Sequence, residues 1–204
     1  MPGPVWTWGS TAGERAEPFP CDRYLPEADF VAFRAVDVDA RAELVFRWLC
    51  QLRVAPYSYD WIDNLGRRSP RALTPGLEDL EDGQRFMTIF RLAEHEPGRS
   101  ITLRHSGLVF GRFAVTYRVA PRGPERSRLV VKLLAQLPRS PMRPALRQLL
   151  AAGDLVMMRR QLLNLKGLAE RSALGPGARM SGEPGLALGA DDRREVAEGD
   201  VDVH

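Results

Sequence analysis

The sequence has few of the residues from which metal and redox sites are built. Cys21 and Cys50 are its only cysteines, and its three histidines, at positions 95, 105 and 204, form no paired ligand motif. Two thiols separated by 28 residues match no zinc or redox spacing. We therefore expect no metal site and no cofactor, and we expect both thiols to be free in a reducing compartment.

Long apolar runs are also missing. No window approaches the roughly 18 consecutive apolar residues that a membrane-spanning helix needs. Residues 1–6 (MPGPVW) lack the basic and apolar regions of a secretory signal. We expect a cytoplasmic protein without stable membrane insertion.

Lysine is nearly absent, and positive charge is not clustered. Of 29 basic residues only Lys132 and Lys166 are lysines, and the arginines are scattered along the chain. The net charge of +3 therefore reflects a bias of composition, and we expect no nucleic-acid partner. From position 175 onward there are seven acidic and three basic residues, which makes the end of the chain acidic.

The chain has enough apolar residues to form one hydrophobic core. The chain has 204 residues, of which 44% are hydrophobic. Residues 1–28 hold four large aromatics among five prolines, and we expect an extended arm, denied a helix by its prolines and packed on the domain. Residues 29–172 form the folded domain. Residues 173–204, rich in Gly, Ala and charge, should be a disordered acidic tail.

The order of elements in residues 29–172 predicts a sheet and one long helix. An apolar strand at 30–38 leads through Asp39, a candidate N-cap, into an amphipathic helix at 40–52. A helical turn at 60–65 follows. Four further strands are expected at 86–92, 101–105, 113–119 and 129–137, joined by turn residues as in an antiparallel meander. A single helix then runs over about 141–171.

The last helix is apolar on two sides. Leu146, Leu150, Gly153 and Met157 share one side, and a longer series from Ala151 to Ala169 lies largely opposite. Such a helix needs two apolar neighbours: the sheet, and a ligand, the N-terminal arm or a second subunit. Gly153 costs about 1 kcal/mol relative to alanine, which a close approach of another group would explain.

Four segments carry a resemblance to a known superfamily. Residues 8–11 (WGST), 57–64 (YSYDWIDN), 79–86 (DLEDGQRF) and 97–104 (PGRSITLR) resemble, in this order, the START-like superfamily (SRPBCC, helix-grip; polyketide cyclase/dehydrase and lipid transport type), and a bacterial branch of it in particular. The resemblance spans roughly residues 6–172. It implies an α+β helix-grip fold, with a curved antiparallel sheet wrapped around the long C-terminal helix.

The resemblance leaves function open, because that superfamily includes lipid carriers, hormone receptors, cyclases and co-chaperones. The chain also departs from the branch at one place. Residues 52–56 read LRVAP where the branch has a glycine-rich stretch, so we expect no glycine loop that cradles a phosphate there.

The first hypothesis is a protein, monomer or homodimer, that binds a hydrophobic small molecule between sheet and helix. The molecule would be lipid-like or polyketide-like and would be held mainly by burial of apolar surface. The aromatic segment at 57–61 offers apolar walls and hydroxyl donors at the mouth. The predicted lining residues are Tyr57, Tyr59, Trp61, Phe90, Leu103, His105, Tyr117, Leu146, Leu150, Gly153 and Met157.

Two alternatives stay open. In a cyclase/aromatase-like enzyme His105, Tyr59 or Asp60 would move protons on a bound polyketone. In a protein-interaction module the second apolar helix face would meet a partner and no ligand would bind. Arg34, inside the apolar first strand, is either an anchor for an anionic head group or an ion-paired residue of the sheet.

Overall fold

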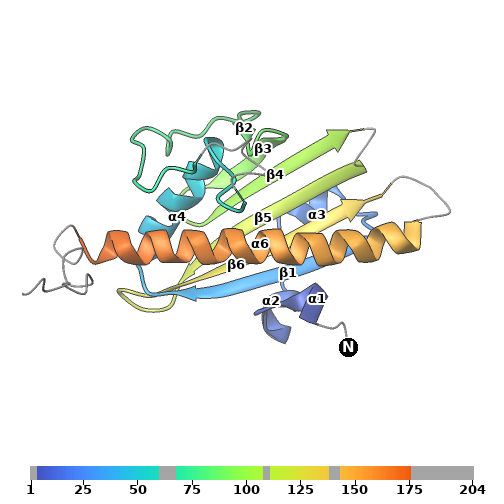
Figure 1. Ribbon diagram of the computed structural model, residues 1–204, viewed down its shortest axis with the longest axis horizontal. Coiled ribbons are helices and arrows are strands. Elements are labelled where there is room, and N and C mark those ends of the chain that lie inside the picture. Colours follow the sequence, from blue (N-terminus) through green and yellow to red (C-terminus); the bar gives the residue numbers. More distant parts are fainter. Residues whose placement is uncertain (1–3, 60–67, 108–110, 138–142, 176–204) are drawn as a thin grey trace, which may run out of the picture.

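A single antiparallel sheet and one long helix form the frame of the protein. The computed structural model describes residues 4–59, 68–107, 111–137 and 143–175, without the side chains of residues 4 and 143–146. Its six strands stand in the order β1-β6-β5-β4-β3-β2, and every neighbouring pair is antiparallel (Figure 1). The strands are β1 (Phe30–Val38), β2 (Arg85–Phe86), β3 (Phe90–Glu96), β4 (Ser100–Gly107), β5 (Gly111–Pro121) and β6 (Ser127–Gln136).

The long helix α6 (Arg143–Ala173) lies in front of the sheet, as Figure 1 shows. It packs along β1 and against helix α4 (Ala42–Cys50), and the short 3-10 helix η1 (Gln51–Arg53) follows α4. The α+β helix-grip fold is therefore confirmed. Asp39 is not the cap of α4: the N-cap position is Arg41, and the Asp39 carboxylate accepts from Arg126 Nε at 2.9 Å.

Strand β1 is apolar on both faces because both faces are covered. Phe30, Ala32, Val36 and Val38 point into the large core between the sheet and α6. Phe33 and Ala35 alternate with them and join a second cluster on the opposite face. A strand buried on both sides reads as a continuous apolar run, which is what the sequence shows at this position.

The predicted strand at 86–92 is wrong in one respect. It is a tight hairpin rather than one strand, with β2 and β3 paired at Phe86 and Phe90. Met87 and Thr88 form the turn with φ of 42° and 66°, in the left-handed region. Sequence reasoning misses this turn because it expects Gly, Asn or Asp at positive φ, and because apolar alternation continues through the turn.

The N-terminal residues fold into three short helices: α1 (Pro4–Thr7), α2 (Ala12–Ala16) and α3 (Cys21–Tyr24). The expected extended conformation is therefore wrong. Proline is tolerated in the first turn of a helix, so the prolines bound these helices rather than exclude them. Phe19, Cys21 and Leu25 are buried on the face of the sheet opposite α6.

The backbone between α1 and α2 seals the outer edge of β1. The Trp8 carbonyl accepts from the backbone N–H of Ala35 at 3.0 Å. Gly9 has φ of 73°, and a Cβ on it would lie 2.1 Å from the Ala35 carbonyl oxygen. Only glycine permits this approach, and the approach removes an exposed strand edge.

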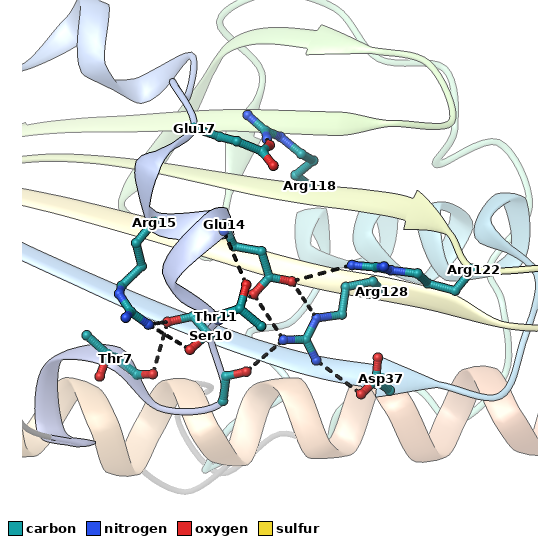
Figure 2. Close-up of polar contacts among 11 residues, drawn as sticks. Thr7, Ser10, Thr11, Glu14, Arg15, Glu17, Asp37, Arg118, Arg122 and Arg128 are labelled. Carbon is teal, nitrogen blue, oxygen red and sulfur yellow. Dashed lines mark hydrogen bonds and ion pairs between the residues drawn. The ribbon is translucent and has the colours of Figure 1, made fainter.

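Glu14 and Arg128 join this N-terminal segment to strand β6 (Figure 2). Arg128 Nε and Nη2 donate to the two Glu14 carboxylate oxygens at 2.7 and 3.1 Å, and Nη2 also donates to Gly9 O at 2.7 Å. Glu14 also closes a capping box with Thr11 at the start of α2. The hydrogen bond from Arg128 is the largest influence lowering the pKa of Glu14, to about 2.

Cys21 and Cys50 are free and buried in separate places. Burial raises the pKa of Cys21 to about 11 and that of Cys50 to about 12. Both therefore stay as thiols at neutral pH, and neither has the thiolate character of a nucleophile.

We predict that Glu14→Gln lowers the free energy of unfolding by about 2 kcal/mol at pH 7. The folded-state pKa of Glu14 lies below the ordinary 4.5, so its contribution is present above pH 4.5 and is lost as pH falls towards 2. Urea unfolding at pH 7, 4 and 3 measures the difference, which should shrink with acidity. Glu17→Gln is the matched control, because Glu17 pairs with Arg118 while 58% exposed and should matter little. An equal effect of both variants would contradict the assignment.

Candidate functional site

A buried ion pair joins the middle of the edge strand β1 to α6. Arg34 of β1 is fully buried, and its Nη2 donates to Asp154 Oδ2 of α6 at 2.7 Å. Its Nη1 donates to the carbonyl of Phe33 at 2.8 Å, and its Nε has no hydrogen-bond partner among the described residues. Of the two roles considered for Arg34, the ion pair is the one observed.

The environment of Asp154 is dominated by burial. Desolvation raises the pKa of Asp154 to about 6, and the attraction of Arg34 opposes this shift. Desolvation likewise lowers the pKa of Arg34, against the effect of Asp154. Each charge is therefore tolerated at neutral pH because the other is within hydrogen-bond distance.

A second polar group in the same interior is satisfied by the chain itself. Tyr117 of β5 is fully buried, and its hydroxyl donates to Gln161 Oε1 at 2.7 Å. Gln161 Nε2 donates in turn to Pro56 O at 2.6 Å. Burial raises the pKa of Tyr117 far above its usual range. These groups fill the interior at mid-length of α6, so a ligand there would have to displace hydrogen bonds already made.

Three aromatic rings on the same face of the sheet are only partly buried. The ring of His105 on β4 lies 6.0 Å from that of Phe90 and 6.2 Å from that of Phe113. In the register of the sheet this group continues through Ala135 to Phe30 of β1, which contacts Trp6 at 5.2 Å. We call Phe90, His105 and Phe113 the aromatic cluster.

The His105 ring is held on one side only. Its Nδ1 lies 2.9 Å from the Ile89 carbonyl, so the neutral ring donates there and keeps an acceptor at Nε2. Nε2 has no hydrogen-bond partner among the described residues. Gly107 makes room for the ring, since a Cβ on it would lie 2.7 Å from Nε2.

The predicted lining residues separate into distinct groups. Phe90, Leu103, His105 and Tyr117 share the face of the sheet that meets α6, where Leu103 and Tyr117 are fully buried. Leu150 of α6 is partly buried against the same core. Phe113 of β5 lies on this face as well, and Asp154 and Gln161 of α6 contact Arg34 and Tyr117 on it. Sequence reasoning did not select them, although Phe113 lies opposite His105 once the meander is drawn.

Other predicted residues lie elsewhere. Met157 is 38% exposed, and Gly153 is also exposed, so the structure does not place them between sheet and helix. The close approach expected at Gly153 is wrong, since a Cβ there would meet nothing within 4 Å. Trp61 and Asp60 lie outside the described residues, as does the side chain of Leu146.

Tyr57 and Tyr59 line a separate hollow beside the C-terminal half of α6. Tyr57 is buried edge-on against Trp48, with ring centroids 6.1 Å apart, and its φ of 56° turns the chain there. The hollow has a volume of about 580 Å³. The register of the sheet places His105 in line with Phe30 of β1. Phe30 contacts Trp6, and Trp6 contacts Arg147 near the beginning of α6. The structure therefore does not bring His105 and Tyr59 together.

The described residues contain no candidate metal site. No group of three or more His, Cys, Asp or Glu side chains there could hold a metal ion. Among the same residues, no helix is both long enough and apolar enough to cross a membrane.

Comparisons with known proteins find similarity of fold. No model of a protein family matches the sequence, and no curated protein matches it. Similar solved structures include the Zhui aromatase/cyclase from a Streptomyces species (18% identity, 71% of this chain, 97% of that chain, TM-score 0.49). A START superfamily protein from Mycobacterium smegmatis is similar too (15% identity, 70% of this chain, 98% of that chain, TM-score 0.44). At these identities the likeness concerns the fold alone.

We predict strong coupling between Arg34 and Asp154. Arg34→Met or Asp154→Leu alone should cost about 3–5 kcal/mol of unfolding free energy, because each leaves one buried charge without its partner. The double variant should recover most of this loss, which a double-mutant cycle by chemical denaturation measures. The exposed pair Arg126–Asp39, at 2.9 Å, is the control and should couple by about 0–1 kcal/mol. Additive effects at Arg34 and Asp154 would contradict the prediction.

Proposed function

We propose that the protein binds an apolar small molecule, lipid-like or polyketide-like, against the aromatic cluster between the sheet and the N-terminal half of α6. The observation that carries the proposal is the partial exposure of three neighbouring rings on a face that is otherwise core. Burying such rings under a ligand would gain about 25 cal/mol per Å² of apolar surface.

The position of the helices explains why this part of the face is available. Helix α6 makes its sheet contacts mainly with β1, and α4 packs on β5 and β6. The aromatic cluster belongs instead to β3, β4 and the beginning of β5. A ligand held there would complete the core that α4 and α6 complete elsewhere.

The cluster supplies one polar group to orient a ligand. His105 Nε2, an acceptor in the neutral ring, is buried beside Gly107 without a hydrogen-bond partner among the described residues, so a ligand would reach it only after a shift of the ring or of Gly107. A single hydrogen-bonding group among apolar walls is typical of a site that binds a hydrophobic molecule.

Binding is supported better than the cyclase-like alternative. Proton transfer on a polyketone needs at least two groups that converge on one ligand carbon. Among the described residues, His105 is the one proton-transfer group in the cluster, and Tyr59 lines the separate hollow. Tyr117 is fully buried, and its hydroxyl is bonded to Gln161.

Native mass spectrometry of the purified protein, followed by denaturing extraction, is the direct test. A discrete apolar molecule that leaves on denaturation is the expected result. Fluorescence titration with cis-parinaric acid and with a hydroxyanthraquinone then distinguishes a lipid-like from a polyketide-like ligand. Failure to detect a bound molecule and failure of both probes to bind would together overturn the proposal.

We predict that Phe113→Ala weakens binding of the better probe by about tenfold or more. Loss of the ring removes contact area worth about 1.5–2 kcal/mol, and 1.4 kcal/mol corresponds to a factor of ten. Arg112→Ala is the matched control, because Arg112 precedes Phe113 on β5 and is exposed. Thermal unfolding of both variants checks that the fold is kept. Unchanged affinity in a folded Phe113→Ala protein would place the ligand elsewhere.

A further inference from the structure

The hollow beside the C-terminal half of α6 has a composition unlike that of the aromatic cluster. Its volume is about 580 Å³, within the ordinary range for small-molecule sites. Its described lining residues include three arginines and no acidic residue: Tyr57, Ser58, Tyr59, Ser69, Pro70, Arg71, Arg160, Asn164, Leu168 and Arg171. We call it the arginine hollow.

Ion pairing divides the arginines of this protein into two groups. Nine arginines in the described part of the chain lie within ion-pair distance of a carboxylate, as Arg47 does against Glu78 at 2.7 Å and Arg118 against Glu17 at 2.6 Å. Arg71, Arg160 and Arg171 form no ion pair with any residue in the described part of the chain. Three uncompensated guanidinium groups around one concavity are a field of one sign, which favours an anion.

Helical spacing brings two of these arginines to one side of α6. Positions 160, 164, 168 and 171 recur at intervals of 4, 4 and 3 residues, and all four line the hollow. Arg71 comes from the long connection between η1 and β2 and lines the same hollow. The three charges are therefore contributed by two segments that are distant in sequence.

Side-chain anchors hold the walls of the hollow in place. Asn164 Nδ2 donates to the Tyr57 carbonyl at 2.8 Å, which joins the first wall to α6. Three residues after Arg71, the buried Gln51 amide bonds both the carbonyl and the N–H of Thr74, at 3.2 and 3.0 Å. Side-chain hydrogen bonds therefore hold the backbone at Tyr57 and at Thr74, which lie on either side of Arg71 in the sequence.

We propose that the arginine hollow binds a phosphate monoester, that is, a small molecule with a terminal dianionic phosphate. One guanidinium group can donate two parallel hydrogen bonds to two oxygens of a phosphate. Three guanidinium groups therefore suit a phosphate group with three terminal oxygens. The hydroxyl-bearing residues Ser58, Tyr59 and Ser69 also line the hollow. Tyr57 and Leu168 are buried, so the apolar surface left for the organic part of the molecule comes from the partly exposed Tyr59 and Pro70.

This site is independent of the apolar ligand proposed at the aromatic cluster. The cluster lies near the beginning of α6, where Arg147 stacks on Trp6, whereas the hollow follows residues 160–171. Loss of one site by mutation should therefore leave binding at the other unchanged.

Isothermal titration calorimetry with phenyl phosphate on the full chain tests the proposal. We expect saturable binding that is tighter than that of inorganic phosphate or benzoate and that weakens as salt rises. Arg160→Gln with Arg171→Gln should weaken it by at least about tenfold, the loss of roughly one charge-assisted hydrogen bond. Arg41→Gln with Arg99→Gln is the control: it removes the same two charges at exposed positions, where Arg41 pairs with Glu125 at 3.8 Å and Arg99 with Glu96 at 3.2 Å.

Co-sedimentation with vesicles containing phosphatidic acid separates a free phosphate monoester from a lipid head group. Phenyl phosphate binding without vesicle binding supports the small-molecule site. Vesicle binding without phenyl phosphate binding overturns it. It is also overturned if benzoate binds as tightly as phenyl phosphate, or if Arg41→Gln with Arg99→Gln weakens binding as much as Arg160→Gln with Arg171→Gln.

Discussion

The buried pair of Arg34 and Asp154 is the interaction on which the arrangement of sheet and helix depends. It joins the middle of β1 to the middle of α6 through a charge-assisted hydrogen bond of 2.7 Å. Two charges removed from water tolerate little displacement, because either one alone would be unfavourable in the core. The pair therefore fixes where α6 lies along β1. On one side of it α6 leaves the aromatic cluster partly exposed, and on the other it forms one wall of the arginine hollow.

Strand β1 can hold α6 in place because the N-terminal residues contact its outer edge and cover its second face. Its outer edge is bonded by Trp8, its second face is covered by Phe19 and Leu25, and Glu14 ties the segment to β6. Without these contacts the edge strand would present unpaired backbone groups and an apolar face to water. The residues before β1 are thus part of the fold, and their stability at acid pH follows the charge of Glu14.

The sequence was sufficient for the fold class and for most strands, because those depend on periodicity and turn chemistry. It failed where the deciding contact joins distant residues. The hairpin at Met87 and Thr88 has no local signal. The faces of α6 were assigned from spacing alone, and Gly153 and Met157 turned outward because Asp154 turns inward to Arg34. For the candidate sites, strand alternation predicted that His105 and Phe90 share one face, whereas Phe113 needed the register of the sheet, and Arg160 needed the placement of Tyr59 and Arg71 beside α6.

The spacing of the two proposed sites limits what a single ligand can do. Ten residues of α6 separate Leu150, which packs against the same core as the aromatic cluster, from Arg160, the first residue of α6 that lines the arginine hollow. Ten residues correspond to about 15 Å along the helix axis. A compact phosphate ester in the arginine hollow cannot reach the aromatic cluster over this distance, and the interior between them is filled by Tyr117, Gln161 and the Arg34–Asp154 pair. The two sites therefore act separately for any compact molecule. Only an extended ligand that passes outside Tyr117, Gln161 and the Arg34–Asp154 pair would connect the two sites.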